Sequence, residues 1–228
     1  MTTPFVAIVV AAGSGERLGA YVPKALVILD DRPLVRHAVD ALVMAGCTDV
    51  VVTIPAGRRA DVEDALAGMA VPYALVEGGA TRQDSVRIAL GALPDDADLV
   101  LVHDAARPLV PADVVTRVAD AVAAGADAVV PAVPVSDSLR RVHDHGSEVV
   151  DRAGLWHVQT PQGFRGSVLR RGHEAALSSG VNVTDDAAAA ELVGAEVLVV
   201  PGDRAALKVT DPFDLAVARL VRRERRTR

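Results

Sequence analysis

Residues 6–19 read VAIVVAAGSGERLG, an apolar run that passes directly into a glycine-rich loop, and Pro23-Lys24 follows shortly afterwards. Apolar runs rich in β-branched residues are typical of strands buried on both faces, as in parallel sheets covered by helices. In such sheets, ligands bind at the carboxyl ends of the strands. Glycines let backbone N–H groups approach an anion closely, and Arg17 and Lys24 add two positive charges. The stretch therefore predicts a loop that holds the phosphates of a nucleotide.

The loop differs from two common nucleotide-binding motifs. A Walker A loop ends in Gly-Lys-Ser/Thr, and no such pair follows Gly19. The dinucleotide motif requires Gly-x-Gly-x-x-Gly, whereas the glycines here are spaced as Gly-x-Gly-x-x-x-Gly. It also requires an acidic residue at the tip of the second strand, where residues 51–55 read VVTIP. A plain strand-to-helix turn remains the alternative, and the two cations argue against it.

Length and composition limit the class of protein. A chain of 228 residues suits one α/β domain spanning 1–228, and the net charge of −6 argues against a nucleic-acid surface. The single cysteine, Cys47, excludes an internal disulfide and suits a reducing cytoplasm. No leader and no apolar run of membrane-spanning length is evident, so we expect a cytoplasmic protein without a membrane contact. The arginine-rich end, residues 222–228, is interpreted as a solvated helix end.

Strand and helix patterns alternate along the chain, which predicts a doubly wound, Rossmann-like and mostly parallel α/β sheet with right-handed crossovers. The expected strands are Phe5–Val10, Val50–Ile54, Tyr73–Val76, Leu99–Val102, Ala128–Pro131 and Glu196–Val200. The expected helices are Pro33–Ala45, Ala60–Leu66, Thr81–Ala92 and Pro111–Ala123.

One segment, about 132–154, interrupts this alternation. Residues 138–142 and 148–152 predict a hairpin that turns at His145-Gly146. It is too polar to bury both faces, and isolated two-stranded ribbons are marginal in water. We interpret it as a projecting β-arm that packs on a second copy of the chain; a mobile surface excursion is the alternative.

Two further polar clusters follow predicted strands. In the cluster at 77–86, Gly79, Ala80 and Ser85 could recognise the edge of a base, or Thr81 and Asp84 could cap a helix. In the cluster at 99–108, Asp104 could bind Mg²⁺ or a ribose hydroxyl, and Arg107 could meet a second anion. Lys208 ends a later strand and would add another cation to a phosphate pocket.

With these clusters in place, the sequence resembles the 2-C-methyl-D-erythritol 4-phosphate cytidylyltransferase family over essentially its whole length. The motifs that carry the resemblance are AAGSGERLG at 11–19 with Pro23-Lys24, GGxxRxxSV at 78–86, HDAARP at 103–108, PVxD at 134–137, DR at 151–152, LWxxQTPQ at 155–162, TD at 184–185 and KVT at 208–210. Within the family's pattern, Ser138 replaces a usual threonine and Arg140 replaces a usual lysine.

The resemblance implies a nucleotide-diphospho-sugar transferase type of fold and transfer of CMP from CTP to 2-C-methyl-D-erythritol 4-phosphate, with release of pyrophosphate and with Mg²⁺ as cofactor. It implies a homodimer joined through the arm. The residues that it implies in contact with CTP are Ala11, Ala12, Gly13, Gly15, Gly79, Ala80, Ser85, Asp104 and Ala105, with Asp104 at the metal. Those that it implies for charge stabilisation and positioning are Arg17, Lys24, Arg152 and Lys208. Those that it implies in contact with the acceptor are Arg107, Ser138, Thr160 and Thr184.

This chemistry agrees with the residues present. Transfer at an α-phosphate depends on positioning and charge neutralisation, and an ionised phosphate nucleophile needs no general base. Two alternatives stay open: a cytidylyltransferase of the same fold that acts on ribitol 5-phosphate, and a nucleotide-binding protein without catalysis.

Overall fold

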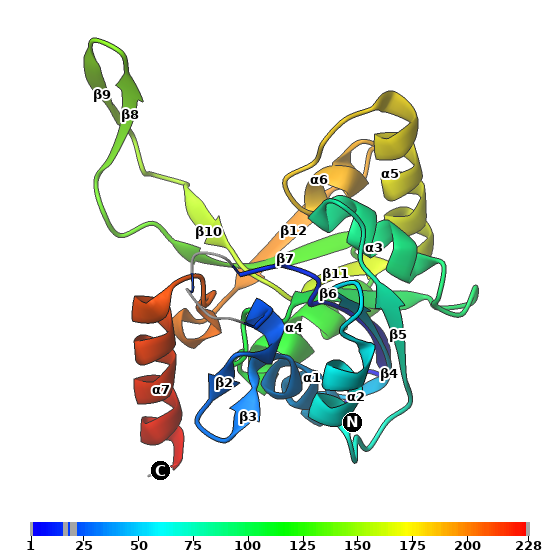
Figure 1. The fold of residues 1–228 in the computed structure, drawn as a ribbon. Helices are drawn as coiled ribbons and strands as arrows, with labels where there is room; N and C mark the ends of the chain where they lie inside the picture. Colours follow the sequence, from blue (N-terminus) through cyan, green and yellow to red (C-terminus); the bar gives the residue numbers. More distant parts are fainter. Residues whose placement is uncertain (1, 16–17, 19–21, 227–228) are drawn as a thin grey trace.

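The core of the molecule is a mixed sheet of eight strands in the computed structural model, which describes residues 2–15, 18 and 22–226 (Figure 1). The strands are β1 (Phe5–Val10), β4 (Cys47–Ile54), β5 (Tyr73–Glu77), β6 (Leu99–Asp104), β7 (Ala128–Pro134), β10 (Trp156–Val158), β11 (Gln162–Arg165) and β12 (Val197–Pro201). β5, β4, β1 and β6 pair in parallel in that order, and β12 pairs in parallel with β7. β11 runs antiparallel between β6 and β7, and β10 runs antiparallel to the end of β7.

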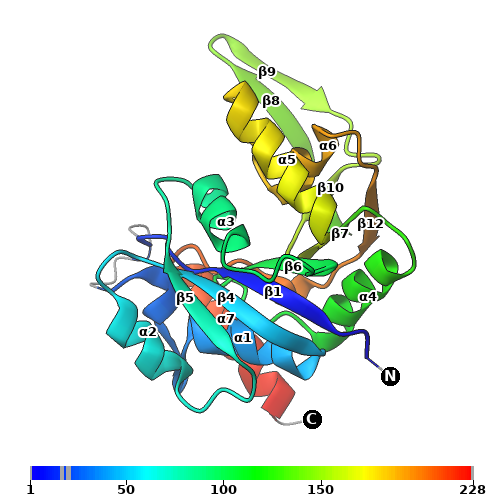
Figure 2. The ribbon, with the colours of Figure 1, turned by 90° about the vertical axis from the view of Figure 1, so that its right-hand side faces the viewer.

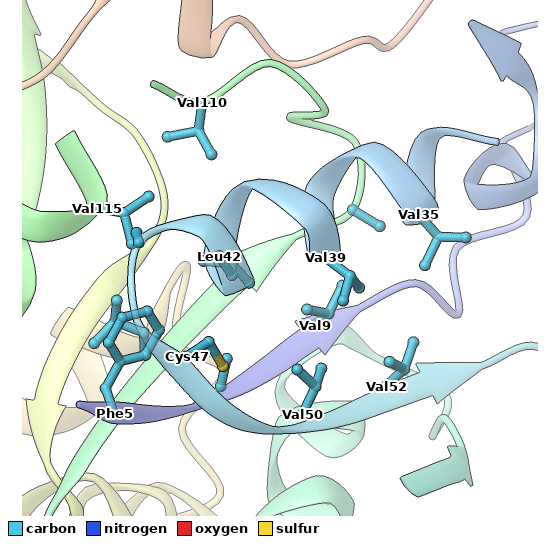
Figure 3. Close-up of a cluster of buried hydrophobic side chains, with 14 of the residues drawn as sticks. Phe5, Val9, Val35, Val39, Leu42, Cys47, Val50, Val52, Val110 and Val115 are labelled. Atoms are coloured by element: carbon cyan, nitrogen blue, oxygen red, sulfur yellow. The ribbon is translucent and has the colours of Figure 1, made fainter. Parts of the chain in front are cut away.

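Helices cover both faces of this sheet (Figure 2). α1 (Leu34–Met44), α2 (Arg59–Leu66) and α4 (Ala112–Ala123) pack on one face, and α3 (Arg82–Leu90), α5 (Gly166–Ser179) and α6 (Asp186–Glu191) pack on the other. Side chains alternate along β1 because a strand has a period of two residues. Val9 therefore packs in the cluster that contains Val39 and Leu42 (Figure 3), while Ile8 packs in the opposite cluster with Val86.

The predicted doubly wound fold is confirmed, and each expected strand and helix is present within a few residues. The sequence patterns did not indicate β10, β11, α5 or the short strands β2 (Ile28–Leu29) and β3 (Arg32–Pro33). β11 is four residues long, QGFR, and is too short to show a period. Its antiparallel insertion makes the sheet less uniformly parallel than expected.

The predicted hairpin is present as β8 (Leu139–His143) and β9 (Gly146–Val150), paired antiparallel and projecting away from the sheet (Figures 1 and 2). The turn falls at residues 144–145, one position earlier than expected. Arg141 forms an ion pair with Glu148 at 2.6 Å across the two strands. Most side chains of the hairpin are exposed.

The arginine-rich end belongs to the C-terminal helix α7 (Pro212–Arg226), in which residues 223–225 are exposed, as expected, whereas Arg222 is half-buried. Arg222 forms ion pairs with Asp30 and Asp31, each at 3.0 Å, and Arg225 donates a hydrogen bond to the carbonyl of Leu109. These contacts fix α7 on the body of the protein, beside the 3-10 turn η2 (Lys24–Leu26) and the short hairpin formed by β2 and β3. Within the described part of the chain, no helix combines the length and the apolarity needed to cross a bilayer.

Candidate active site

A pocket of about 460 Å³ lies at the carboxyl ends of β1, β5 and β6. The predicted site residues that line it are Ala11, Ala12, Gly13, Lys24, Gly79, Ala80, Ser85, Asp104, Ala105 and Lys208. These residues come from five separate segments of the chain. The parallel pairing brings them together because it sends successive strand ends to the same edge of the sheet.

The glycine-rich loop passes very close to its neighbours. Gly15 has a φ of +74°, and a Cβ there would lie 2.6 Å from the Cβ of Lys24. A Cβ on Gly78 would lie 2.3 Å from the Cβ of Ala12. Only glycine fits at both positions, and the two close approaches bring the loops after β1 and β5 and the Lys24 segment against one another.

The helix-cap interpretation of the second cluster is confirmed. Thr81 is the N-cap of α3, and with Asp84 it forms a reciprocal capping box. The hydroxyl of Ser85 donates to the carbonyl of Thr81 at 2.9 Å and accepts the N–H of Gly79 at 3.1 Å. The N–H of Gly79 and the hydroxyl proton of Ser85 are thus used within the loop, and their arrangement shapes the wall of the pocket.

Asp104 ends β6 and lies between two cations. Its Oδ1 is 3.1 Å from Nε of Arg82, and its Oδ2 is 2.8 Å from Nζ of Lys208. Burial alone would raise the pKa of Asp104, but Arg82 and Lys208 outweigh burial and hold that pKa well below its usual range. The carboxylate is therefore ionised and locally compensated.

A buried pair of side chains supports Asp104 from beneath. The Thr160 hydroxyl accepts the backbone N–H of Asp104 at 3.0 Å, so its own proton is available to Nδ1 of His103, also at 3.0 Å. Nε2 of His103 then donates to the carbonyl of Arg107 at 3.2 Å. Burial lowers the pKa of His103 to about 4, so the ring is neutral near pH 7.

Arg107 does not line this pocket, and its predicted contact with a second anion stays a prediction. Its guanidinium donates to the carbonyls of Ala206, at 2.7 Å, and Val158, at 3.4 Å. Thr160 is likewise buried and bonded to protein atoms instead of facing the pocket. Both side chains hold strand-end loops together, a role that spacing in the sequence cannot distinguish from ligand contact.

Ser138, Arg152 and Thr184 also lie away from the pocket lining. Arg17 lies outside the described residues. Ser138 and Thr184 are exposed, and Arg152, also exposed, donates a hydrogen bond to the carbonyl of Ser136 at the base of the hairpin. Within the single chain, the pocket therefore gathers the predicted CTP residues other than Gly15, but not the predicted acceptor residues.

Sequence reasoning gave no role to Arg82, which lines the pocket and contacts Asp104. Its NH1 also lies 2.8 Å from Oδ2 of Asp186, another residue that sequence reasoning left without a role. His173 contacts the other oxygen of Asp186 at 3.0 Å. Two signals were available in the sequence: Arg82 is the arginine of the motif GGxxRxxSV, and it lies in the polar cluster that follows a predicted strand.

The described residues contain no cluster of three or more His, Cys, Asp or Glu side chains suited to a metal. Asp104 is the carboxylate that lines the pocket. Each of its oxygens makes one contact with a cation and keeps a second lone pair. This donor set suits Mg²⁺, which commonly takes one or two protein carboxylates and completes its shell with phosphates and water.

The fold and the pocket define a nucleotide-binding α/β protein with a doubly wound sheet, a glycine-rich phosphate loop and cations at the strand ends. The chain belongs to the 2-C-methyl-D-erythritol 4-phosphate cytidylyltransferase family, whose family model matches residues 5–224. It is therefore a cytidylyltransferase, an enzyme of the nucleotidyltransferase class.

Individual relatives agree with this membership. The chain is 46% identical to 2-C-methyl-D-erythritol 4-phosphate cytidylyltransferase of Streptomyces avermitilis, over 96% of this chain and 92% of that protein. It is 48% identical to the protein of the same name from Saccharopolyspora erythraea, over 95% and 98% of the two chains. The crystal structure of the Thermus thermophilus enzyme matches with a TM-score of 0.81 at 34% identity, covering 96% of this chain and 99% of that one.

Proposed function

We propose that this protein transfers CMP from CTP to 2-C-methyl-D-erythritol 4-phosphate and releases pyrophosphate, a step of the non-mevalonate route to isoprenoid precursors. The observation that carries the proposal is the convergence of the glycine-rich loop, Lys24, Asp104 and Lys208 on one pocket in a chain of this family. A pocket of about 460 Å³ is large enough for a nucleotide.

The chemistry is an attack by a phosphate oxygen of the acceptor on the α-phosphorus of CTP. A new P–O bond forms, the bond to the bridging oxygen of the β-phosphate breaks, and pyrophosphate leaves. The nucleophile is already ionised near neutral pH, so the neutral His103 beneath the site is not needed as a base. The principal task is to offset repulsion between two polyanions, and we assign it to Lys24 and Lys208, with Arg17.

We propose that Mg²⁺ binds with Asp104 as its protein ligand, in the donor set described above. When bound together with the triphosphate, the ion supplies further positive charge beside the α-phosphate. Asp104 is buried and held in place by Arg82, Lys208 and the Thr160 hydroxyl, so its own position does not depend on the ligand.

For CTP, we propose that the loop residues hold the phosphates and that the segment after β5 holds the base. The phosphate residues are Ala11, Ala12, Gly13 and Gly15; the base residues are Gly79, Ala80 and Ser85; and Ala105 lies with Asp104 at the ribose. The polar contacts of Arg107 and Thr160 favour a role in shaping the site. Thr184 remains a proposed acceptor contact.

We propose that the whole chain, 1–228, acts as one nucleotidyltransferase domain and that the arm, about 132–154, joins two copies in a homodimer. The arm exposes apolar side chains that a partner could cover: Val142 is 79% exposed and Val149 is 71% exposed, with Trp156 at its base 47% exposed. Ser138 and Arg152 would then reach the acceptor in the partner's pocket. The lone Cys47, buried in β4, is consistent with a cytoplasmic enzyme.

The test is a pyrophosphate-release assay with purified protein, CTP and Mg²⁺. We expect release with 2-C-methyl-D-erythritol 4-phosphate, and a cytidylyl product of matching mass. Ribitol 5-phosphate in a parallel reaction tests the alternative acceptor. Binding of CTP without release for either acceptor would contradict the proposal and favour a non-catalytic nucleotide-binding protein.

A further inference from the structure

An unbroken row of charged groups leads from the pocket into the protein. Lys208 contacts Asp104, Asp104 contacts Arg82, and Arg82 contacts Asp186, with distances of 2.8, 3.1 and 2.8 Å. His173 closes the row with a contact of 3.0 Å to Asp186. The side chain of Lys208 is 40% exposed, whereas those of Asp186 and His173 are each 1% exposed. The row therefore begins at the substrate side and ends in the core.

The inner end of this row is firmly anchored. The amide oxygen of Gln162, on β11, accepts the backbone N–H groups of Asp186 and Ala187 at 3.2 and 3.1 Å. Asp185 caps the same helix through the N–H of Ala188 at 3.0 Å, and its carboxylate accepts a hydrogen bond from Gln162. Asp186 is thus held by its own backbone, by β11 and by α5 at once.

Arg82 occupies a place where both of its contacts are carboxylates. Its Nε donates to Asp104 and its NH1 pairs with Asp186, so the planar guanidinium is held in one orientation. A guanidinium fixed in this way cannot swing out to a phosphate without removing the cation from one oxygen of each of two buried carboxylates. Its geometry suits support of Asp104 more than capture of substrate.

Asp104 needs such support because it carries negative charge inside a pocket proposed to take two polyanions. Lys208 compensates one oxygen but is well exposed, and a flexible ammonium defines an orientation poorly. The guanidinium on the other oxygen is the rigid contact. Without it, the carboxylate would both repel the phosphates and lose its defined direction.

We propose that Arg82 is a positioning residue for the transfer reaction, that it fixes and compensates Asp104, and that Asp186, supported by His173, sets the place of Arg82. The inference deepens the proposed function and rests on it. It assigns a role in catalysis to Asp186, whose side chain does not line the pocket.

The first test is a double-mutant cycle on kcat/KM. We expect Arg82→Gln to lower kcat/KM by about 10²-fold and Asp186→Asn, which keeps the side-chain shape, by about 10-fold. In the Arg82→Gln background, the additional effect of Asp186→Asn should fall below about 2-fold, because Asp186 acts through Arg82. Independent, multiplying effects would overturn the inference.

The second test is metal-free binding of CTP in EDTA, which does not depend on turnover. Arg82→Gln should weaken binding because it removes the cation from Oδ1 of Asp104 and leaves more of the carboxylate's charge facing the phosphates. The added substitution Asp104→Asn should restore binding toward the wild-type value. If Arg82 instead bound a phosphate directly, the second substitution would not restore it, and the inference would fail.

Folding is monitored by thermal unfolding, and Arg82→Lys covers the case in which the glutamine variant does not fold. A lysine keeps the charge but cannot span both carboxylates, so we expect a folded variant with kcat still lowered about 10-fold. Wild-type kcat in Arg82→Lys would refute the bridging role. Arg87→Gln, on the exposed side of the same helix, is the matched control and should behave as wild type.

Wild-type protein that transfers no CMP would refute the proposed function itself, and this result is distinct from the outcomes for the Arg82 variants.

Discussion

The pocket and the projecting hairpin differ in whether their side chains find partners within the same chain. In the pocket, each oxygen of Asp104 faces a cation from the same chain, and Thr160 holds its backbone from beneath. In the hairpin, Val142 and Val149 face solvent, and no element of the described chain packs over the tip. The carboxylate of the pocket is thus paired within the chain, whereas the arm exposes apolar side chains that the proposed second chain would cover.

This contrast supports the arm as the site of the proposed dimer contact. A two-stranded ribbon without a sheet or helix beneath it is marginal in water. The groups proposed to hold CTP belong to segments fixed by the sheet, and Ser138 and Arg152, proposed to reach the acceptor, belong to the arm. Substitutions in the two regions should therefore have different signatures, and the following predictions test that separation in order of expected size.

The largest effect should come from the pocket. Lys24→Ala should lower kcat by about 10²-fold or more, because the variant loses a cation placed where charge develops in the transition state. Pyrophosphate release at saturating substrates measures this effect, and gel filtration checks that the dimer content is unchanged. A near-normal rate would remove Lys24 from the proposed machinery.

A smaller loss should come from Arg152 in the arm. Arg152→Gln should lower kcat/KM for the acceptor by about 10-fold, the size expected for one charge-assisted contact. Binding of CTP, measured by calorimetry, should stay as in the wild type, because Arg152 does not line the pocket of its own chain. Equal loss of CTP binding would erase the distinction between the two regions.

The exposed valines of the hairpin test its proposed contact with a second chain. The double substitution Val142→Ser, Val149→Ser should weaken the dimer and lower activity a few-fold at low protein concentration, because buried apolar area drives such contacts. Analytical ultracentrifugation gives the dimer dissociation constant. Met44→Ser, which changes an equally exposed apolar residue on α1, is the control and should leave association unchanged.

The smallest effect is a pH dependence of stability that originates beneath the pocket. The pKa of His103 is lowered to about 4 by burial, while an unfolded chain titrates near its ordinary value of 6.5, so acid favours the unfolded chain. Stability from this group is present above pH 6.5 and is lost as the pH falls toward 4. Between pH 6.5 and 5.5 the loss should be about 1 kcal/mol.

Urea unfolding at the two pH values measures this loss. In His103→Gln the change in unfolding free energy over the same interval should be smaller by about the same 1 kcal/mol. His145→Gln, at the exposed tip of the hairpin, is the arm control and should retain the wild-type pH dependence. An unchanged slope in His103→Gln would mean that the buried ring does not contribute.

The sequence predicted most of the sheet and much of the pocket for a specific reason. Buried parallel strands such as β1 and β6 are written as apolar runs, and the residues directly after them must lie at one edge. Lys24 lies in the 3-10 turn η2 (Lys24–Leu26), and Lys208 follows the 3-10 turn η3 (Arg204–Ala206) and does not end a strand as expected. Asp104, the last residue of β6, follows from this rule. The contacts of Arg107 and Thr160 do not follow from it, because a polar residue near a strand end can face either a ligand or a neighbouring backbone group at the same spacing.

Local pattern and motifs in order were enough to establish the fold class, the family and the strand ends that carry the chemistry. Packing in three dimensions was needed to place Arg82 between Asp104 and Asp186, and to fix α7 on the body through Arg222. Those contacts join residues far apart in the chain. They depend on the direction of each side chain and on burial, and neither is encoded in spacing along the sequence.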